Sequence, residues 1–166
     1  MSKLNLTISI DDVNPLKGWG AEGDIQMTYL DNLNKEFGAK FTLFIPSNYH
    51  NQAPLSKHKG WVDWLKSKDY FELAELNSEI KSKDRVKQMM MEWEAVGYKP
   101  EGFRSPGWLC HPAAVGELEK YFKYVAIHYI HNREQKWNCK TLYGADGINL
   151  KGGTIHNENT IMFQSH

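Results

Sequence analysis

Two adjacent carboxylates, Asp11 and Asp12, end an alternating run of polar and apolar residues near the start of the chain. The run reads Thr-Ile-Ser-Ile-Asp-Asp at residues 7–12, and its period of two predicts a strand. Successive side chains of a strand point to opposite sides, so one carboxylate could hold a metal ion while the other acts on a water molecule. The alternative interpretation is an Asp pair that starts a turn before Pro15, because Asp favours turns.

Segments with strand-like and helix-like periodicity alternate along the rest of the chain, which predicts an α/β fold with a parallel sheet. Gly38 and Gly97 follow two of the predicted helices, at the position where helices commonly stop. A polar loop through His50 and Asn51 follows the second predicted strand and is long enough to face a ligand. The predicted strands are residues 4–10, 40–45, 70–74, 102–104, 124–130 and 159–166. The predicted helices are residues 24–37, 58–68, 78–95 and 111–122.

Length and composition limit the classes of protein that the chain can represent. A chain of 166 residues with 41% hydrophobic residues fits one globular domain, expected to span residues 1–166. Twenty basic and twenty acidic residues cancel without a basic run, which argues against a nucleic-acid partner. No stretch approaches the roughly 20 apolar residues of a membrane span, and no signal-peptide core opens the chain, so we expect no membrane partner and a cytoplasmic location. Cys110 and Cys139 lack C-x-x-C spacing and are expected to be buried thiols.

Three further segments accompany the Asp pair in order along the chain. Residues 39–44 read Ala-Lys-Phe-Thr-Leu-Phe, residues 97–108 read Gly-Tyr-Lys-Pro-Glu-Gly-Phe-Arg-Ser-Pro-Gly-Trp, and residues 161–166 read Ile-Met-Phe-Gln-Ser-His. Together with residues 7–12, they resemble four motifs of the polysaccharide deacetylases, carbohydrate esterase family 4. The resemblance covers nearly the whole chain, and its arginine motif at residues 97–108 is the most specific. It implies a distorted, incomplete (β/α) barrel with the site at the carboxyl ends of the strands.

The resemblance also implies a role for residues that match these motifs. Asp11 would be the general base that deprotonates a metal-bound water, Asp12 would be a ligand of that metal, and His166 would be the general acid for the leaving amine. The divalent metal would be zinc, with Mn, Mg, Co or Ni as alternatives. Such an ion lowers the pKa of its bound water from about 15.7 to about 7 and polarises the amide carbonyl, so a carboxylate and an imidazole suffice to hydrolyse an N-acetyl bond.

Residues of the arginine motif would complete the site. Arg104 would hold the base carboxylate by a charge-assisted contact and keep it ionised, and Trp108 and Pro106 would line the substrate groove. Taken alone, Arg104 could equally brace a loop, and Trp108 could fill the core. The other histidines lack metal-ligand spacing except for one pair three residues apart on a strand-like run, whose members would face opposite sides. We interpret these histidines as structural: His50, His58, His111, His128, His131 and His156.

One motif of the family has no counterpart in this sequence. Where His-x-x-x-His would follow the third strand, Ala74 is followed by Glu-Leu-Asn-Ser-Glu at residues 75–79. In one interpretation Glu75 and Glu79 take the histidine positions, which would give an all-oxygen site for Mg, Mn or Ca. In the other, which we favour, a metal-binding loop is missing and Glu75 begins the next helix. The helix with which the family usually continues is also expected to be missing after His166.

These features predict a metal-dependent hydrolase that removes an acetyl group from an N-acetylated sugar or oligosaccharide. The alternative is a catalytically degenerate carbohydrate-binding domain of the same fold that keeps the substrate groove. A metal phosphoesterase built on the Asp pair has the least support, because no phosphate-binding glycine loop or basic cluster accompanies it. The expected partner is therefore a small molecule or an oligosaccharide, and the sequence does not predict an oligomeric state.

Overall fold

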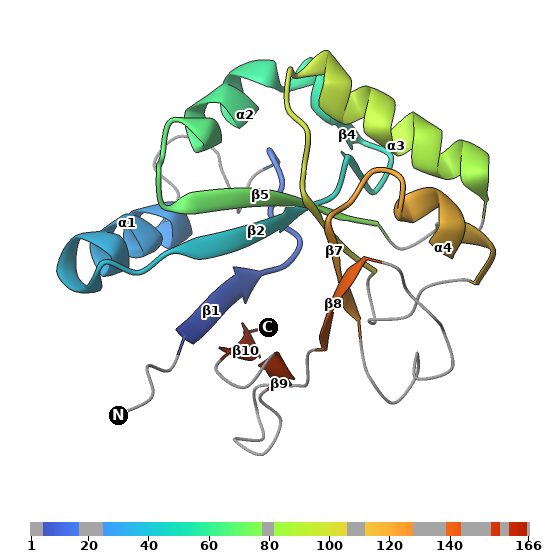
Figure 1. Cartoon of the computed structure of the whole chain (residues 1–166). Coiled ribbons are helices and arrows are strands. Elements are labelled where there is room, and N and C mark those ends of the chain that lie inside the picture. Colours follow the sequence, from blue (N-terminus) through green and yellow to red (C-terminus); the bar gives the residue numbers. More distant parts are fainter. Residues whose placement is uncertain are drawn as a thin grey trace.

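Strands and helices alternate along most of the chain, in agreement with the predicted α/β class (Figure 1). The computed structural model describes residues 5–16, 25–77, 82–105, 112–127, 139–143, 154–156 and 160–165. The strands are β1 Asn5–Ile10, β2 Phe41–Ile45, β3 Asn48–Tyr49, β4 Ala53–Pro54, β5 Phe71–Leu76, β6 Gly102–Arg104, β7 Tyr124–Ile127, β8 Lys140–Tyr143, β9 Thr154–His156 and β10 Thr160–Ser165. The helices are α1 Ile25–Phe37, α2 Lys59–Lys66, α3 Lys83–Ala95 and α4 Pro112–Leu118, with a 3-10 helix η1 at Leu55–Lys57.

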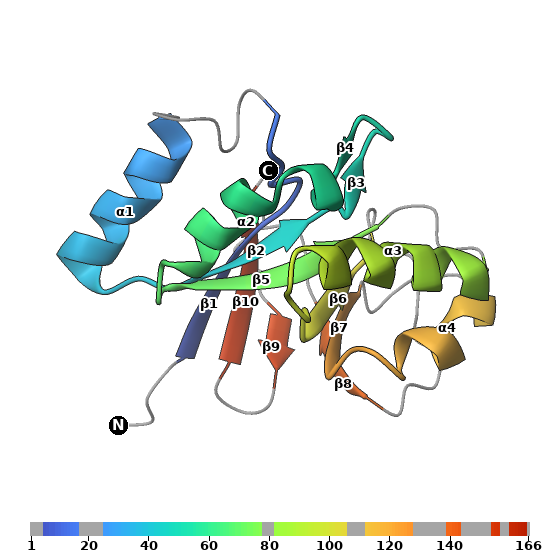
Figure 2. The ribbon, with the colours of Figure 1, turned by 90° about the horizontal axis from the view of Figure 1, so that it is seen from above.

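Eight of these strands form one sheet in the order β8-β7-β6-β5-β2-β1-β10-β9. All neighbouring pairs run parallel except β10 with β9. The sheet curls around one of its faces, and helices α1 to α4 lie against the other face (Figures 1 and 2). We call the first the concave face and the second the helix-covered face.

The apolar core lies mainly between the sheet and the helices. Alternate residues of β2 and β5 pack against α1, α2 and α3, which contribute Met27, Val62 and Trp93 among others. A second cluster joins α3 and α4 to β6 and β7 through Met89, Leu118 and other buried side chains. Burial of these apolar surfaces supplies the main driving force for this arrangement.

Polar side chains alternate with apolar ones on the concave face. Glu72 accepts hydrogen bonds from the Thr42 hydroxyl (2.8 Å) and from the Tyr124 hydroxyl (2.7 Å). The Tyr124 ring lies so close to Gly102 that a Cβ at that position would be 2.1 Å from Cζ of the ring. Phe44 and neighbouring apolar side chains fill the space between these polar groups. The concave face is therefore a packed layer that carries its own hydrogen bonds.

Two glycines end helices as the sequence predicts. Gly38 and Gly97 have φ values of 65° and 66°, a region that residues with a Cβ rarely adopt. Their backbone N–H groups donate to the carbonyl oxygens of Asn34 (2.7 Å) and Glu94 (2.9 Å), which closes the last turns of α1 and α3.

The prediction that Glu75 begins a helix is wrong. β5 continues through Glu75 to Leu76, and α3 begins only at Lys83, with the Ser82 hydroxyl accepting a hydrogen bond from the Arg85 amide. Glu75 pairs with both neighbouring strands, β2 and β6, and is completely buried. Its helix-like local pattern is overridden because the backbone at this position is already hydrogen-bonded inside the sheet.

Two other predicted boundaries also differ from the structure. The polar loop after β2 contains the short antiparallel pair β3 and β4. Helix α4 ends at Leu118 instead of continuing to Phe122. The carbonyl of Leu118 still accepts from the amides of Tyr121 and Phe122, so the chain leaves the helix through a tight turn.

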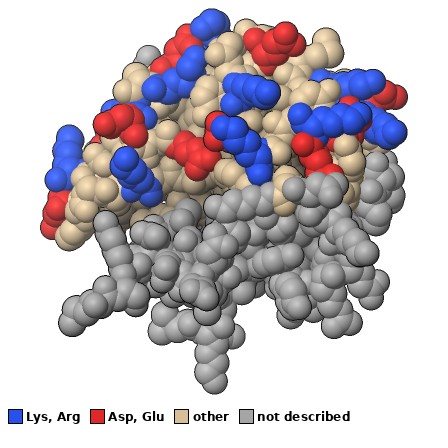
Figure 3. Space-filling view, in the orientation of Figure 1, with Lys and Arg blue, Asp and Glu red and all other residues tan. Residues whose placement is uncertain are grey.

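Charged side chains of both signs are interspersed over the visible helix-covered side (Figure 3). This distribution agrees with the equal numbers of acidic and basic residues in the sequence. Among the described residues, no helix is both long enough and apolar enough to cross a lipid bilayer.

Candidate active site

Asp11 and Arg104 meet at the carboxyl ends of the parallel strands. Asp11 follows β1 and Arg104 ends β6, and β2 and β5 lie between these two strands in the sheet. Three strand spacings amount to about 14 Å in a flat sheet, so the contact depends on the curl that brings β6 toward β1 across the concave face. Two residues 93 positions apart in sequence are thereby joined.

The Arg104 guanidinium is buried beneath the Asp11 carboxylate. Nη1 donates to Oδ1 of Asp11 at 2.5 Å, and Nη2 donates to the Ser9 hydroxyl at 3.0 Å. The central guanidinium carbon lies 3.8 Å from the centroid of the Phe44 ring. The Arg104 side chain is 0% exposed, whereas the Asp11 side chain is 18% exposed. A fixed cation therefore supports a carboxylate that still reaches solvent.

Opposing effects act on the charge of Arg104. Burial lowers the pKa of its guanidinium, and the charge and hydrogen bond of Asp11 raise it again. Arginine stays protonated in proteins because its ordinary pKa is above about 12. The charge-assisted contact that the resemblance implied is therefore present in the structure, while the catalytic roles of Asp11 and Arg104 remain predictions.

Asp12 lies two residues after the end of β1, where the backbone leaves the extended conformation of the strand. Its φ of 58° lies in the left-handed region, which Asp tolerates better than most residues. Its backbone carbonyl accepts a hydrogen bond from the Asn14 side chain at 2.7 Å. Partial desolvation and the nearby Asp11 carboxylate raise the pKa of Asp12, and the charge of His50 lowers it. Asp12 and His50 are thus close enough to interact electrostatically.

His50 is a candidate site residue that sequence reasoning missed. It lies at the tip of the β3–β4 hairpin with a φ of 48°, and its ring packs edge-on against Tyr49 with centroids 4.2 Å apart. The available signal was its position in a loop that directly follows a parallel strand, because such loops gather at the carboxyl edge of the sheet. The sequence predicted that this loop could face a ligand, but it did not single out His50, which lacks paired metal-ligand spacing and was interpreted as structural.

The Glu75 side chain does not share a site with Asp12, so it is not placed to bind a metal ion together with Asp12. It faces α3 on the helix-covered side, where its Oε2 accepts a hydrogen bond from the Trp93 indole N–H. Its Oε1 accepts from the Ser47 amide and from the Asn77 side chain, both at 3.4 Å. Burial raises the pKa of Glu75 to about 8, and these N–H donors lower it only in part. Glu79, its partner in the all-oxygen interpretation, lies outside the described residues.

The described residues do not fit the metal site that the resemblance implies. Within them, no three His, Cys, Asp or Glu side chains are placed to share an ion. Asp12 is the one metal ligand that the resemblance implies, whereas catalytic zinc sites usually use three protein ligands. The divalent metal, with zinc as the first candidate, therefore remains a prediction.

Three predicted site residues, Pro106, Trp108 and His166, lie outside the described residues. The backbone of β10 runs parallel to β1, and its last residue, Ser165, is in register with Ile10. The carboxyl ends of β1 and β10 therefore lie side by side, at the same end of the strands as Asp11.

No protein-family model and no curated protein matches the sequence. Among solved structures, the fold is similar to that of a 4-alpha-glucanotransferase from Thermococcus litoralis, with 16% sequence identity and a TM-score of 0.47. The aligned region covers 79% of this chain and 23% of that one, so the chain spans about a quarter of that protein's length.

Proposed function

We propose that this chain is a hydrolase that removes the acetyl group from an N-acetylated sugar or oligosaccharide. We further propose that its curled sheet is the distorted, incomplete (β/α) barrel of the polysaccharide deacetylase type. The observation that best supports the proposal is the contact between Asp11 and Arg104. It joins the first motif to the arginine motif at the carboxyl end of a parallel sheet, which is where α/β folds usually hold their active sites.

The chemistry of the proposal requires a base that reaches both water and substrate. The Asp11 carboxylate would accept a proton from water as the water oxygen adds to the amide carbonyl. The C–N bond then breaks as the nitrogen takes up a proton, which yields acetate and a free amine. Arg104 would position the Asp11 carboxylate through its buried guanidinium, and His166 would supply the proton to the amine.

A second candidate is a carbohydrate-binding domain of the same fold without catalysis. The observation that favours it is the shortage of metal ligands at the carboxyl edge, since within the described residues Glu75 faces α3 instead of Asp12. Such a domain would retain affinity for sugars after metal chelation and would release no acetate.

The test is the release of acetate from N-acetylated chito-oligosaccharides by the whole chain, with and without added zinc. We expect Asp11→Asn to lower kcat/KM by about 100-fold or more, because general-base catalysis contributes about 10²–10⁴-fold. Asp63→Asn is the matched control, since Asp63 is an exposed carboxylate of α2 paired with Lys59. Equal rates for Asp11→Asn and the wild type would refute the role of Asp11.

Metal content separates the two candidates independently of substrate choice. Elemental analysis of the purified wild type and of Asp12→Ala shows whether a divalent ion binds and whether Asp12 holds it. One ion per chain that is lost in the variant would place the remaining ligands among residues outside the described ranges. Absence of metal from both proteins, together with retained sugar binding and no acetate release, would favour the binding domain.

A further inference from the structure

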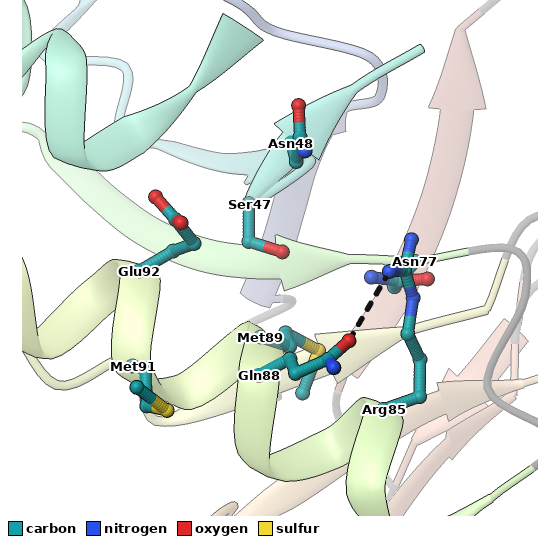
Figure 4. Close-up of a pocket in the computed structure, with 8 residues that line it drawn as sticks. All are labelled: Ser47, Asn48, Asn77, Arg85, Gln88, Met89, Met91 and Glu92. Carbon is teal, nitrogen blue, oxygen red and sulfur yellow. Dashed lines mark hydrogen bonds between the residues drawn. The ribbon is translucent and has the colours of Figure 1, made fainter. Parts of the chain in front are cut away.

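A small polar pocket lies on the helix-covered side of the sheet, between the turn after β2, the end of β5 and helix α3 (Figure 4). Its volume is about 230 Å³. Arg85 extends from α3 toward Asn77, and its Nη1 is 3.5 Å from Oε1 of Gln88. Most lining residues carry amide, hydroxyl or charged groups: Ser47, Asn48, Asn77, Arg85, Gln88 and Glu92.

The chemistry of the lining favours an uncharged, hydroxyl-rich ligand. Three side-chain amides can each donate and accept hydrogen bonds, as the hydroxyl groups of a sugar require. Arg85 and Glu92 carry opposite charges, and Oε2 of Glu92 already accepts the Ser56 amide at 2.9 Å. Because these charges offset each other, the pocket is poorly suited to a phosphate group or a divalent cation.

The size of the pocket sets a limit on the ligand. Sites for drug-sized molecules usually occupy about 300–1,000 Å³, so a pocket of about 230 Å³ suits one small ring. Met89 and Met91 also line it, and their thioether side chains can contact the apolar side of such a ring. These features together match a single pyranose unit.

One backbone hydrogen bond connects a pocket residue to Arg104 of the proposed catalytic pair. The Asn77 amide donates to the Arg104 carbonyl at 3.2 Å, so adjacent strand ends carry the pocket and the guanidinium that supports Asp11. Asn48 lies two residues before His50 on the same hairpin. The pocket therefore lies at the carboxyl ends of the strands, as Asp11 does, but on the helix-covered face of the sheet.

Glu75 fixes the floor of the pocket from inside the core. Its Oε1 accepts hydrogen bonds from the Ser47 amide and the Asn77 side chain, both of which belong to pocket-lining residues. The same carboxyl group is anchored to α3 through the indole of Trp93. Two lining residues are thus held in place before any ligand binds, which reduces the entropy that binding would cost.

We propose that this pocket binds one uncharged pyranose unit of an oligosaccharide. The inference rests on the proposed function for the class of ligand, although binding to the pocket does not require catalysis. Gln88 is the residue to test, because it lines the pocket and is exposed on α3, where substitution does not disturb the core.

The experiment measures binding of fully N-acetylated chitotetraose, which is uncharged, by calorimetry in the Asp11→Asn background, which prevents turnover. We expect Gln88→Leu to raise the dissociation constant at least tenfold. Lys87→Leu is the matched control, because Lys87 is an exposed neighbour on α3 outside the pocket, and we expect it to leave the constant unchanged. Urea midpoints of the two variants check that both remain folded.

The outcomes separate this inference from the proposed function. Equal affinities of Gln88→Leu and Lys87→Leu, or no binding of chitotetraose to the parent protein, would overturn the pocket proposal. Inorganic phosphate that binds and competes with chitotetraose would also overturn it, since the pocket would then be an anion site. Binding that depends on Gln88, in a protein that releases no acetate, would support the pocket and refute the hydrolase.

Discussion

Asp11 and Glu75 are two carboxylates near the same edge of the sheet, and their surroundings differ in kind. Asp11 is on the concave face, where a buried guanidinium supports it and 18% of its side chain reaches solvent. Glu75 is on the helix-covered face, fully buried, and accepts hydrogen bonds from uncharged N–H donors. A carboxylate that is supported by a cation and reaches solvent can exchange a proton with a water molecule. A buried carboxylate that has neither a cation nor access to water can only hold neighbouring residues in place.

The alternation of side chains along a strand explains this difference. Glu75 follows Ala74, which belongs to the concave face, so Glu75 points to the opposite side and toward α3. Asp11 follows the strand that places Ser9 beside Arg104, and both residues contact the same guanidinium. Position along the strand, more than residue type, decides which acid is available for chemistry.

The largest expected effect comes from removing the cation under Asp11. Arg104→Met should lower the free energy of unfolding by about 3 kcal/mol, because breaking a buried ion pair typically costs about 3–5 kcal/mol and Asp11 retains some contact with water. Urea denaturation at pH 7 measures the loss. Arg85→Met, at a partly exposed arginine of α3, is the control and should change stability by less than about 0.5 kcal/mol.

A double variant shows whether Asp11 causes that loss. Adding Asp11→Asn to Arg104→Met removes the uncompensated charge, so the double variant should recover part of the lost stability. If the two substitutions simply add, the contact between Asp11 and Arg104 contributes little, and the contrast with Glu75 would then reflect burial alone.

Glu75 should make the free energy of unfolding fall as pH rises, whereas an acid paired with a cation makes it rise. Its pKa is about 8 in the folded chain, above the ordinary value of 4.5. Between these values the unfolded chain loses the proton and the folded chain keeps it, so the free energy of unfolding should fall as pH rises from 5 to 8 and level off above that. The slope cannot exceed about 1.4 kcal/mol per pH unit for one group.

Comparison with Glu75→Gln isolates this contribution. The glutamine has nearly the same shape and stays neutral, so the decline in stability with pH should become shallower in the variant. Glu94→Gln on the exposed side of α3 serves as the control and should follow the wild-type curve. Parallel curves for the wild type and Glu75→Gln would mean that Glu75 is ionised in the folded chain as readily as in the unfolded chain.

The periodicity of the sequence was sufficient to predict most elements of the sheet and the helices. Alternation predicted β1, a run of strand-forming residues predicted β2, helical spacing predicted α1, and Gly38 and Gly97 marked two helix ends, because these signals are local and each is reinforced by burial. The pairing of Asp11 with Arg104 came from the resemblance, since no local pattern links residues 93 positions apart.

His50 and Glu75 show where local signals fail. The charge of His50 lowers the pKa of Asp12 although the two residues are far apart in sequence, and the β3–β4 pairing that carries His50 was not predicted. Glu75 lies in a sequence that suits the start of a helix, yet its strand is hydrogen-bonded on both sides. A buried Glu is rare enough that sequence reasoning assigns it to the surface unless its partners, here Trp93, Ser47 and Asn77, are already known.

Glu72 is a third carboxylate of the sheet, and removing one of its hydrogen bonds should have the smallest effect on stability. The Tyr124 hydroxyl donates to it at 2.7 Å, and burial together with Glu72 raises the pKa of Tyr124, so this donor stays protonated at any ordinary pH. Tyr124→Phe keeps the ring over Gly102 and removes one hydrogen bond, which should cost about 1 kcal/mol in urea unfolding. Tyr29→Phe, on the exposed side of α1, is the control. The loss should stay small because Thr42 still donates a hydrogen bond to Glu72. A loss of stability as large as that of Arg104→Met would mean that Tyr124 also supports the buried guanidinium. The carboxylates of the concave face would then act as one network.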